Sequence, residues 1–199
     1  MNKKYTLATF CKTRGFTPEW LASKAGYLTI DERTKRMPDE DLIIGGDLII
    51  DHHVFPYFPS KVLVGGNLRI QFGHRFEFPA HFEVTGDVEM DYVRFDSIHE
   101  GCVFHRSVTI YHSSFQKIRD NFHVHGSLNL AHSTFSELPK GLVVDDVLTI
   151  TGAPITEIPD DCRCRFLAYI IHSGFISGYQ NRYGDNLKPP TNVYHRMTA

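Results

Sequence analysis

Residues 42–50 read LIIGGDLII, and residues 62–70, twenty positions later, read VLVGGNLRI. Apolar residues keep returning at this step until about residue 166. Five columns share the phase: Leu42, Val62, Phe82, Cys102, Phe122, Leu142 and Cys162; Ile44, Val64, Val84, Phe104, Val124, Val144 and Cys164; Leu48, Leu68, Val88, Val108, Leu128 and Leu148; Ile50, Ile70, Met90, Ile110, Leu130 and Ile150; and Phe55, Phe95, Phe115, Phe135 and Ile155. The fifth column fails only at Arg75, where Phe76 stands one place late. So long a repeat predicts a solenoid.

Each coil has one internal plan, which predicts short strands. Apolar and polar residues alternate in a first segment such as 62–64 and again in a second such as 68–70, with a glycine-rich corner between them. Alternation with a period of two is typical of strands that bury one face. A coil cannot bury its own apolar face, so stacked coils share one continuous core.

The coil pattern resembles a known family. The motif Leu-Pro-x-x-Leu-x-Val-Gly-Gly-x-Leu-x-Ile, clearest between Leu138 and Ile155, resembles the leucine-rich-repeat-like proteins of bacteria and their phages. The resemblance covers residues 37–165, although this chain is richer in Phe and His and has no fixed Asn column. It implies an interaction protein, for example a phage or effector protein that blocks or modulates a host complex.

The predicted fold is a mainly β, single-domain solenoid of six to seven coils with a small helical cap at its N-terminus. A slender β-helix of short strands and a helix-backed horseshoe both remain open, although twenty residues leave little room for a helix. The expected divisions are a cap at 1–36, the solenoid at 37–165, and a C-terminal cap and tail at 166–199.

The first 36 residues predict two short helices, one over 6–14 and one that begins at Thr17-Pro18 and stops at Gly26. Their large apolar side chains are expected to cover the exposed end of the first coil; these are Phe10, Phe16, Trp20 and Leu21. A DNA-binding regulator with a dimerising solenoid is the alternative. Only Lys24 offers a basic contact on the second helix, which disfavours nucleic acid as the partner.

Composition and charge further limit the class of protein and its location. A formal net charge of −2 gives no broad basic field, and no apolar run approaches the length of a membrane span. Three of the four cysteines fall in apolar columns, which suits reduced thiols in the cytoplasm, or in the host cytoplasm for a viral protein. Cys162 and Cys164 could also form half of a zinc site, but the column phase already explains both residues.

Twelve histidines suggest two kinds of chemistry. The spacing predicts that His105 stacks on His125 and that His112 stacks on His132, while His123 shares an outward face with His125. His105, His123 and His125 could therefore bind zinc or nickel. A ladder of like side chains is the favoured interpretation, so we expect no metal and no cofactor.

Catalytic motifs are weak by comparison. Glu89 and Asp91 form a carboxylate pair on one predicted strand, which would suit a carbohydrate-active enzyme but is more typical of a solvated face. The tripeptide Asp51-His52-His53 matches a phosphoesterase signature, but the further aspartate motifs of that chemistry are missing.

The expected function is therefore non-enzymatic binding of another protein or of a second copy of the chain. Large outward side chains on a rigid sheet are typical of interface hot spots, and outward apolar residues on the first segment suggest a covered face. The candidate surface consists of Ile43, Ile49, Leu63, Arg69, Gln71, Glu89, Asp91 and Tyr111.

Overall fold

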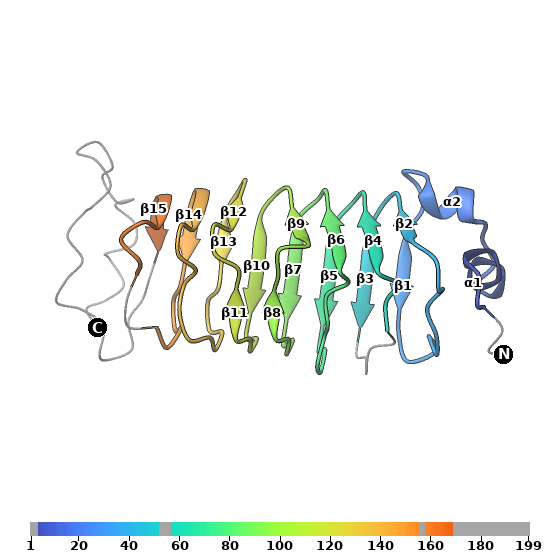
Figure 1. Cartoon of the computed structure of the whole chain (residues 1–199), viewed down its shortest axis with the longest axis horizontal. Coiled ribbons are helices and arrows are strands. Elements are labelled where there is room, and N and C mark those ends of the chain that lie inside the picture. Colours follow the sequence, from blue (N-terminus) through green and yellow to red (C-terminus); the bar gives the residue numbers. More distant parts are fainter. Residues whose placement is uncertain (1–3, 52–56, 156–157, 169–199) are drawn as a thin grey trace, which may run out of the picture.

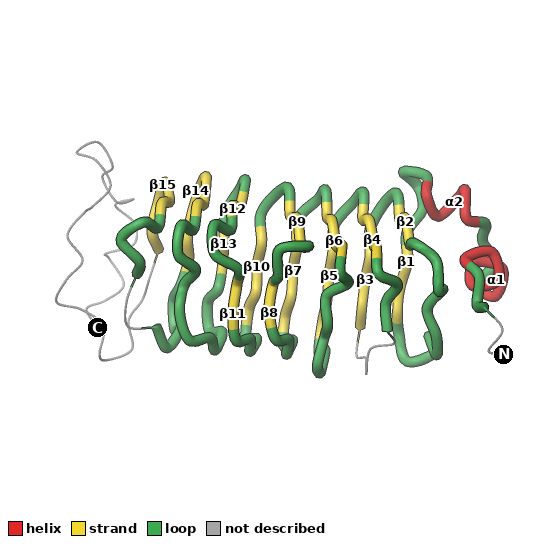
Figure 2. The backbone as a smooth tube through the Cα atoms, viewed as in Figure 1, coloured by secondary structure: helices red, strands yellow, loops and turns green. Residues whose placement is uncertain are grey.

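The computed structural model describes residues 4–51, 57–155 and 158–168. They form a mainly β, parallel solenoid of about seven turns, with two short helices near the N-terminus (Figure 1). The predicted fold class is confirmed. Because the strands within the coils are joined by loops rather than helices, the short-strand β-helix is correct and the helix-backed horseshoe is wrong for the described residues (Figure 2).

The helices are α1 (Leu7–Thr13) and α2 (Pro18–Ala22). The strands are β1 (Leu28–Ile30), β2 (Leu42–Ile44), β3 (Leu48–Asp51), β4 (Lys61–Val64), β5 (Leu68–Gln71), β6 (His81–Val84), β7 (Val88–Asp91), β8 (Ser97–Ile98), β9 (Cys102–Phe104), β10 (Val108–Tyr111), β11 (Lys117–Ile118), β12 (His123–Val124), β13 (Leu128–Asn129), β14 (Val143–Thr149) and β15 (Arg163–Ala168).

The strands form two principal sheets. A nine-stranded sheet contains β1, β3, β5, β7, β10, β13, β14, β12 and β15, and a four-stranded sheet contains β2, β4, β6 and β9. The predicted step of twenty is the pairing register, since Leu48 faces Leu68, Leu68 faces Val88, and Val88 faces Val108. In Figure 1, β4 and β6 point upward while β3, β5 and β7 point downward, so the chain reverses at each corner.

Side chains from both sheets point into one apolar core that runs along the solenoid. All members of the five predicted columns that the structure describes are buried there. Stacked rings continue the column of phenylalanines: the centroids of Phe95 and Phe115 are 4.9 Å apart, as are those of Phe115 and Phe135. Equal phase therefore means direct contact between coils, as the repeat predicts.

The structure differs from the repeat as predicted from the sequence in two places. Phe76 is buried and bridges to Phe95, so it takes the place in the core that Arg75 leaves, and Arg75 itself has a positive φ of 60°. The column member Phe55 lies outside the described residues. The second departure is β1, which pairs with β3 in the common register, so the ladder of paired strands already begins at Leu28.

A ladder of polar side chains connects the coils at the corner. Each backbone N–H of this column donates a hydrogen bond to the side chain one coil earlier: Asn67 N to Asp47 Oδ1 at 2.7 Å, Asp87 N to Asn67 Oδ1 at 2.9 Å, and Ser107 N to Asp87 Oδ1 at 3.1 Å. Ser127 continues it by donating to Ser107 Oγ at 3.1 Å. Different coils therefore use Asp, Asn or Ser as the hydrogen-bond acceptor at this position, and the sequence accordingly shows no fixed Asn column.

The helices lie at the N-terminal end of the solenoid (Figure 1). Both begin as predicted, because the hydroxyls of Thr6 and Thr17 accept hydrogen bonds from Thr9 N and Trp20 N. The second helix ends at Ala22, four residues before the predicted stop at Gly26. Phe10 and Leu21 belong to the core, Phe16 packs against it, and Trp20 lies at its rim.

Close stacking makes Gly101 a sensitive position. A Cβ atom at this residue would lie 1.8 Å from the carbonyl oxygen of Ala80 on the preceding coil. We expect Gly101→Ala to lower the free energy of unfolding by about 1–3 kcal/mol, the usual cost of overpacking. Urea denaturation measures it, with the exposed neighbour Glu100→Ala as the control, expected to stay within about 0.5 kcal/mol. Equal losses in the two variants would contradict the close approach.

Candidate binding surface

The structure divides the predicted surface residues between the two sheets. Ile43 and Leu63 lie on β2 and β4 of the four-stranded sheet. Six residues lie on the nine-stranded sheet: Ile49, Arg69, Gln71, Glu89, Asp91 and Tyr111. Since the inward residues of both sheets share one core, the outward residues of the two sheets face away from each other. A single partner face can therefore include the group of six but not Ile43 and Leu63 as well.

Adjacent strands bring the group of six together. Ile49 pairs in register with Arg69, Arg69 with Glu89, and Gln71 with Asp91. Arg69 Nη2 lies 3.7 Å from Glu89 Oε1, and both side chains are half exposed. Such an exposed ion pair contributes little to folding, so both groups can exchange this contact for a partner.

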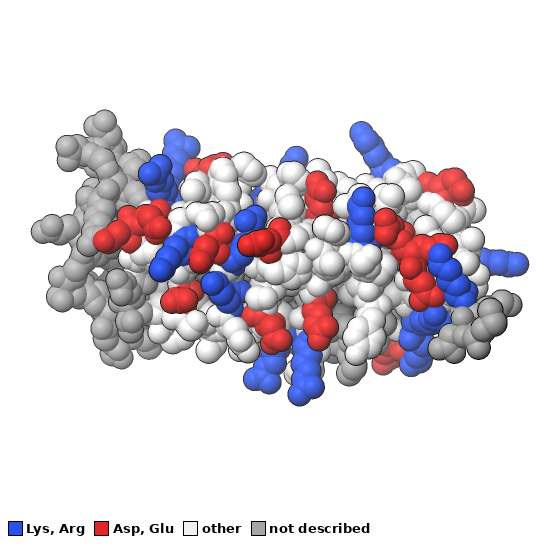
Figure 3. Space-filling view, viewed as in Figure 1, with Lys and Arg blue, Asp and Glu red and all other residues white. Residues whose placement is uncertain are grey.

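Charges of both signs are interspersed along the solenoid on the face shown in Figure 3. Several acids of the surface have a basic or imidazole neighbour, such as Asp91, whose Oδ1 lies 3.4 Å from His112 Nδ1. Glu89 and Asp91, the pair considered for carbohydrate chemistry, thus each have such a neighbour, Arg69 for Glu89 and His112 for Asp91.

A column of exposed rings borders the group of six. We call it the ring column: it consists of Phe72, Tyr92, His112 and His132, each one coil after the last. The ring centroids are 5.5 Å apart between Phe72 and Tyr92, 4.7 Å between Tyr92 and His112, and 5.6 Å between His112 and His132. The predicted stacking of His112 on His132 is confirmed. Phe72 and Tyr92 extend this stack in the preceding coils. Their spacing in steps of twenty residues before His112 was the signal in the sequence that could have identified them.

The backbone of the ring column is unusual. All four residues have positive φ angles, between 46° and 55°. L-residues adopt this left-handed conformation at a cost of roughly 1–2 kcal/mol, while glycine adopts it freely. The next coil has Gly152 at the same phase, with φ 69°. The chain therefore carries large rings at a position where glycine would be less strained.

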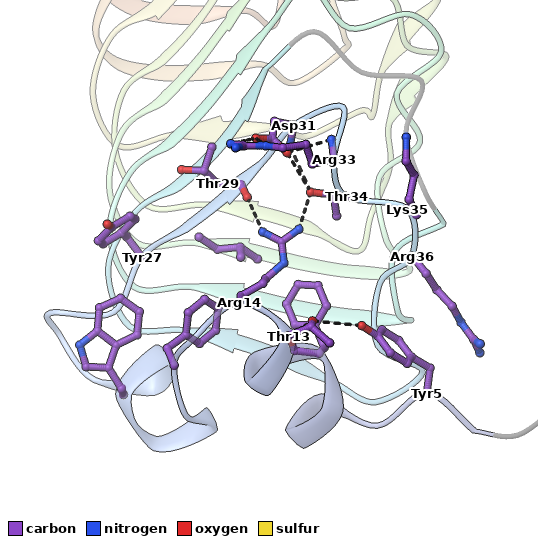
Figure 4. Close-up of a pocket in the computed structure, with 14 residues that line it drawn as sticks. Tyr5, Thr13, Arg14, Tyr27, Thr29, Asp31, Arg33, Thr34, Lys35 and Arg36 are labelled. Carbon is purple, nitrogen blue, oxygen red and sulfur yellow. Dashed lines mark hydrogen bonds and ion pairs between the residues drawn. The ribbon is translucent and has the colours of Figure 1, made fainter.

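A cavity of about 800 Å³ lies between the two helices and the first coil (Figure 4). Arg14 reaches across it: Nη1 donates to the carbonyl oxygen of Thr29 at 3.0 Å, and Nη2 donates to the hydroxyl of Thr34. Burial lowers the pKa of the Arg14 guanidinium. Arg33 is paired with Asp31, and Figure 4 shows Lys35 and Arg36 pointing away from Arg14. Through these contacts Arg14 connects the helical cap to the first coil of the solenoid.

The histidine prediction is partly corrected. His123 and His125 do lie together, with ring centroids 4.1 Å apart. His105 pairs instead with Glu83, with 2.8 Å between Nε2 and Oε1. The third group beside His123 and His125 is Asp145. Asp145 lies twenty residues after His125 and so occupies the same position in the repeat. This spacing was the signal in the sequence that could have identified it.

These features define the class of the protein as a β-solenoid of about seven turns with a repeat of about twenty residues. No protein-family model, curated protein or solved structure matches the chain. Among the described residues, no helix has the length and apolar character needed to cross a membrane.

Proposed function

We propose that this solenoid is a non-enzymatic binding protein whose ligand is another protein. The binding surface is the group of six on the nine-stranded sheet together with the ring column. The observation that carries this proposal is the ring column itself, with four exposed rings on consecutive coils in a left-handed backbone conformation.

Folding alone does not account for these rings. The three stacked pairs together contribute about 1.5–4.5 kcal/mol, which at most offsets the roughly 4–8 kcal/mol that four left-handed residues cost. The side chains of Phe72 and Tyr92 nevertheless remain 43% and 50% exposed. Strained backbone conformations tend to occur where a ligand is held, and exposed Tyr and Phe side chains are favoured at protein interfaces.

The chemistry beside the ring column suits a protein partner. Ile49 is 36% exposed and adds apolar area, while Arg69 and Glu89 add charges of both signs. Hot spots combine aromatic and arginine side chains within a polar surround. Because neighbouring rings of the column stack on one another, the ring faces between them are covered, and Tyr92 and His112 in particular offer their edges rather than their faces to a ligand.

The repeat's resemblance to leucine-rich-repeat-like proteins of bacteria and phages also supports the proposal, because those proteins mainly serve interactions. By analogy with them, the partner would be a host protein complex that the chain blocks or modulates in the cytoplasm. A second copy of this chain is the other candidate for the same surface.

Tyr92→Gly tests the proposal with little disturbance of the fold, because glycine suits the backbone at this position. We expect the free energy of unfolding to change by less than about 1 kcal/mol, since strain and stacking are lost together. Binding should weaken about tenfold or more, as expected for a hot-spot ring. The measurement is capture from a cell extract with mass spectrometry, followed by calorimetry with the purified partner.

Two further variants make the result specific to this surface. Arg69→Glu should weaken binding in the same way, while Val103→Thr on the other sheet should leave it unchanged. Light scattering of the purified chain shows whether the partner is a second copy. Loss of binding in Val103→Thr with retention in Tyr92→Gly would place the interface on the opposite sheet and overturn the proposal.

A further inference from the structure

Two imidazoles and one carboxylate converge at the corner of the solenoid near its C-terminal end. His123 lies on β12, His125 follows this strand, and Asp145 lies on β14, which pairs with β12 in the twenty-residue register. The first two coils have Gly45 and Gly65 at this corner phase, and later coils have Thr85, His105, His125 and Asp145 there. Chemically active side chains thus replace glycine at this corner.

We propose that His123, His125 and Asp145 form a binding site for a divalent transition-metal ion, with zinc as the representative ion. One ligand atom from each residue can be chosen so that all three lie within 4.8 Å of one another. His123 Nε2 is 2.8 Å from Asp145 Oδ1, and His125 Nδ1 is 3.2 Å from Asp145 Oδ2.

These separations suit a tetrahedral ion. Zinc–nitrogen and zinc–oxygen bonds of about 2.0–2.2 Å place neighbouring ligands roughly 3.3–3.6 Å apart. His123 Nε2 and Asp145 Oδ1, 2.8 Å apart, would have to separate by about 0.5–0.8 Å to reach this spacing, and His125 Nδ1 and Asp145 Oδ2, 3.2 Å apart, by about 0.1–0.4 Å, which rotation of the exposed side chains can supply. All three side chains are about half exposed, which leaves the fourth position open to water.

The surrounding charges leave Asp145 available as a ligand. The Asp145 carboxylate contacts the two other proposed ligands, His123 through Oδ1 and His125 through Oδ2. Its neighbour Asp146 is turned to Ser127, whose hydroxyl donates to Asp146 Oδ2 at 3.0 Å. On the next strand, the guanidinium of Arg165 lies over the ring of Phe166.

The donor set indicates which ions should bind. Two imidazole nitrogens and one carboxylate oxygen suit zinc, nickel, copper and cobalt, whereas magnesium and calcium prefer oxygen ligands alone. The pair of His105 and Glu83 provides an internal comparison, because it has the same residue spacing as His123 and Asp145 and the same 2.8 Å separation. Among the described residues this pair belongs to no group of three converging ligands, so it should not chelate an ion.

Calorimetric titration of the full chain with ZnCl₂ at pH 7.5, after removal of any histidine tag, tests the site. We expect one equivalent of zinc to bind saturably and MgCl₂ to give no binding heat. Asp145→Asn and His123→Gln should each weaken zinc binding about tenfold or more, since loss of a ligand should cost at least as much as loss of an outer-shell partner. His105→Gln should bind as the wild type does.

Cobalt gives a second readout that a mere charge effect would not produce. Tetrahedral coordination should give visible absorption bands in the wild type that disappear in Asp145→Asn, while circular dichroism verifies that both proteins are folded. Absence of saturable zinc binding would overturn the proposal. So would an equal loss of affinity in His105→Gln and Asp145→Asn, because the ion would then bind to scattered histidines.

Discussion

Replacing Phe82 by Ala should lower the free energy of unfolding by about 3–5 kcal/mol, the usual cost of deleting a buried phenylalanine ring. Phe82 lies on β6, is 1% exposed, and packs its ring against those of Phe76, Phe78 and Phe104 at centroid distances of 5.6–6.5 Å. The site cannot collapse around the loss, because β4 and β9 hold the coils on both sides by backbone pairing. Because proteins typically have a free energy of unfolding of about 5–15 kcal/mol, this loss would remove a large fraction of the total stability.

Urea denaturation followed by circular dichroism measures this loss. Trp20, the only tryptophan, reports by fluorescence on the N-terminal end of the same transition. Glu83→Ala is the matched control, since Glu83 is the outward neighbour on the same strand and its pair with His105 is exposed. It should cost less than about 1 kcal/mol. A Phe82→Ala loss no larger than that of Glu83→Ala would show that this column does not carry the core.

The core could be predicted from the sequence because a solenoid converts sequence phase directly into contact. Leu48, Leu68 and Val88 lie one above another since each coil has the same length and the same corner. The exception at Arg75 follows the same logic, because Phe76 reaches the core from a coil whose backbone takes a positive φ. The burial of apolar side chains determines the pairing register of the strands, and the period and phase of these side chains can be read directly from the sequence.

The surface was harder to predict because its decisive properties belong to the backbone and to corners. Tyr92 follows an outward residue and resembles any exposed aromatic until its φ of 54° shows the strain. Asp145 stands at a corner where Asp145 and Asp146 replace the glycines of the first coils, and the pairing of β12 with β14 brings it to His123. The predicted surface residues proved to lie on two different sheets. Alternation shows which side chains of a strand point outward, but it does not show how the chain turns between the two strands of a coil.

Raising the pH should destabilise the protein through Cys102. This thiol is fully buried at the centre of the solenoid, and burial raises its pKa to about 12. An unfolded thiol loses its proton near pH 8.5–9, so between about pH 9 and pH 12 the unfolded chain has released a proton that the folded chain still holds. The unfolded state then binds fewer protons, and the free energy of unfolding falls as pH rises. The slope is about 1.4 kcal/mol per pH unit, or about 4 kcal/mol across the three units.

Urea denaturation of the wild type and of Cys102→Ala at several pH values from 8 to 10.5 isolates this effect. Tyrosine and lysine titrations are common to both proteins, so the difference between the two slopes belongs to the thiol. Below about pH 8.5 the variant should be less stable by a constant amount, because the missing sulfur leaves a cavity beside Phe82 and Phe122 in the same column. Above pH 9 the two curves should converge by up to about 1.4 kcal/mol per unit as the wild type loses stability. Parallel curves through pH 10.5 would mean that the thiol ionises in the folded protein, and Cys102 would then have to be accessible to water within its coil.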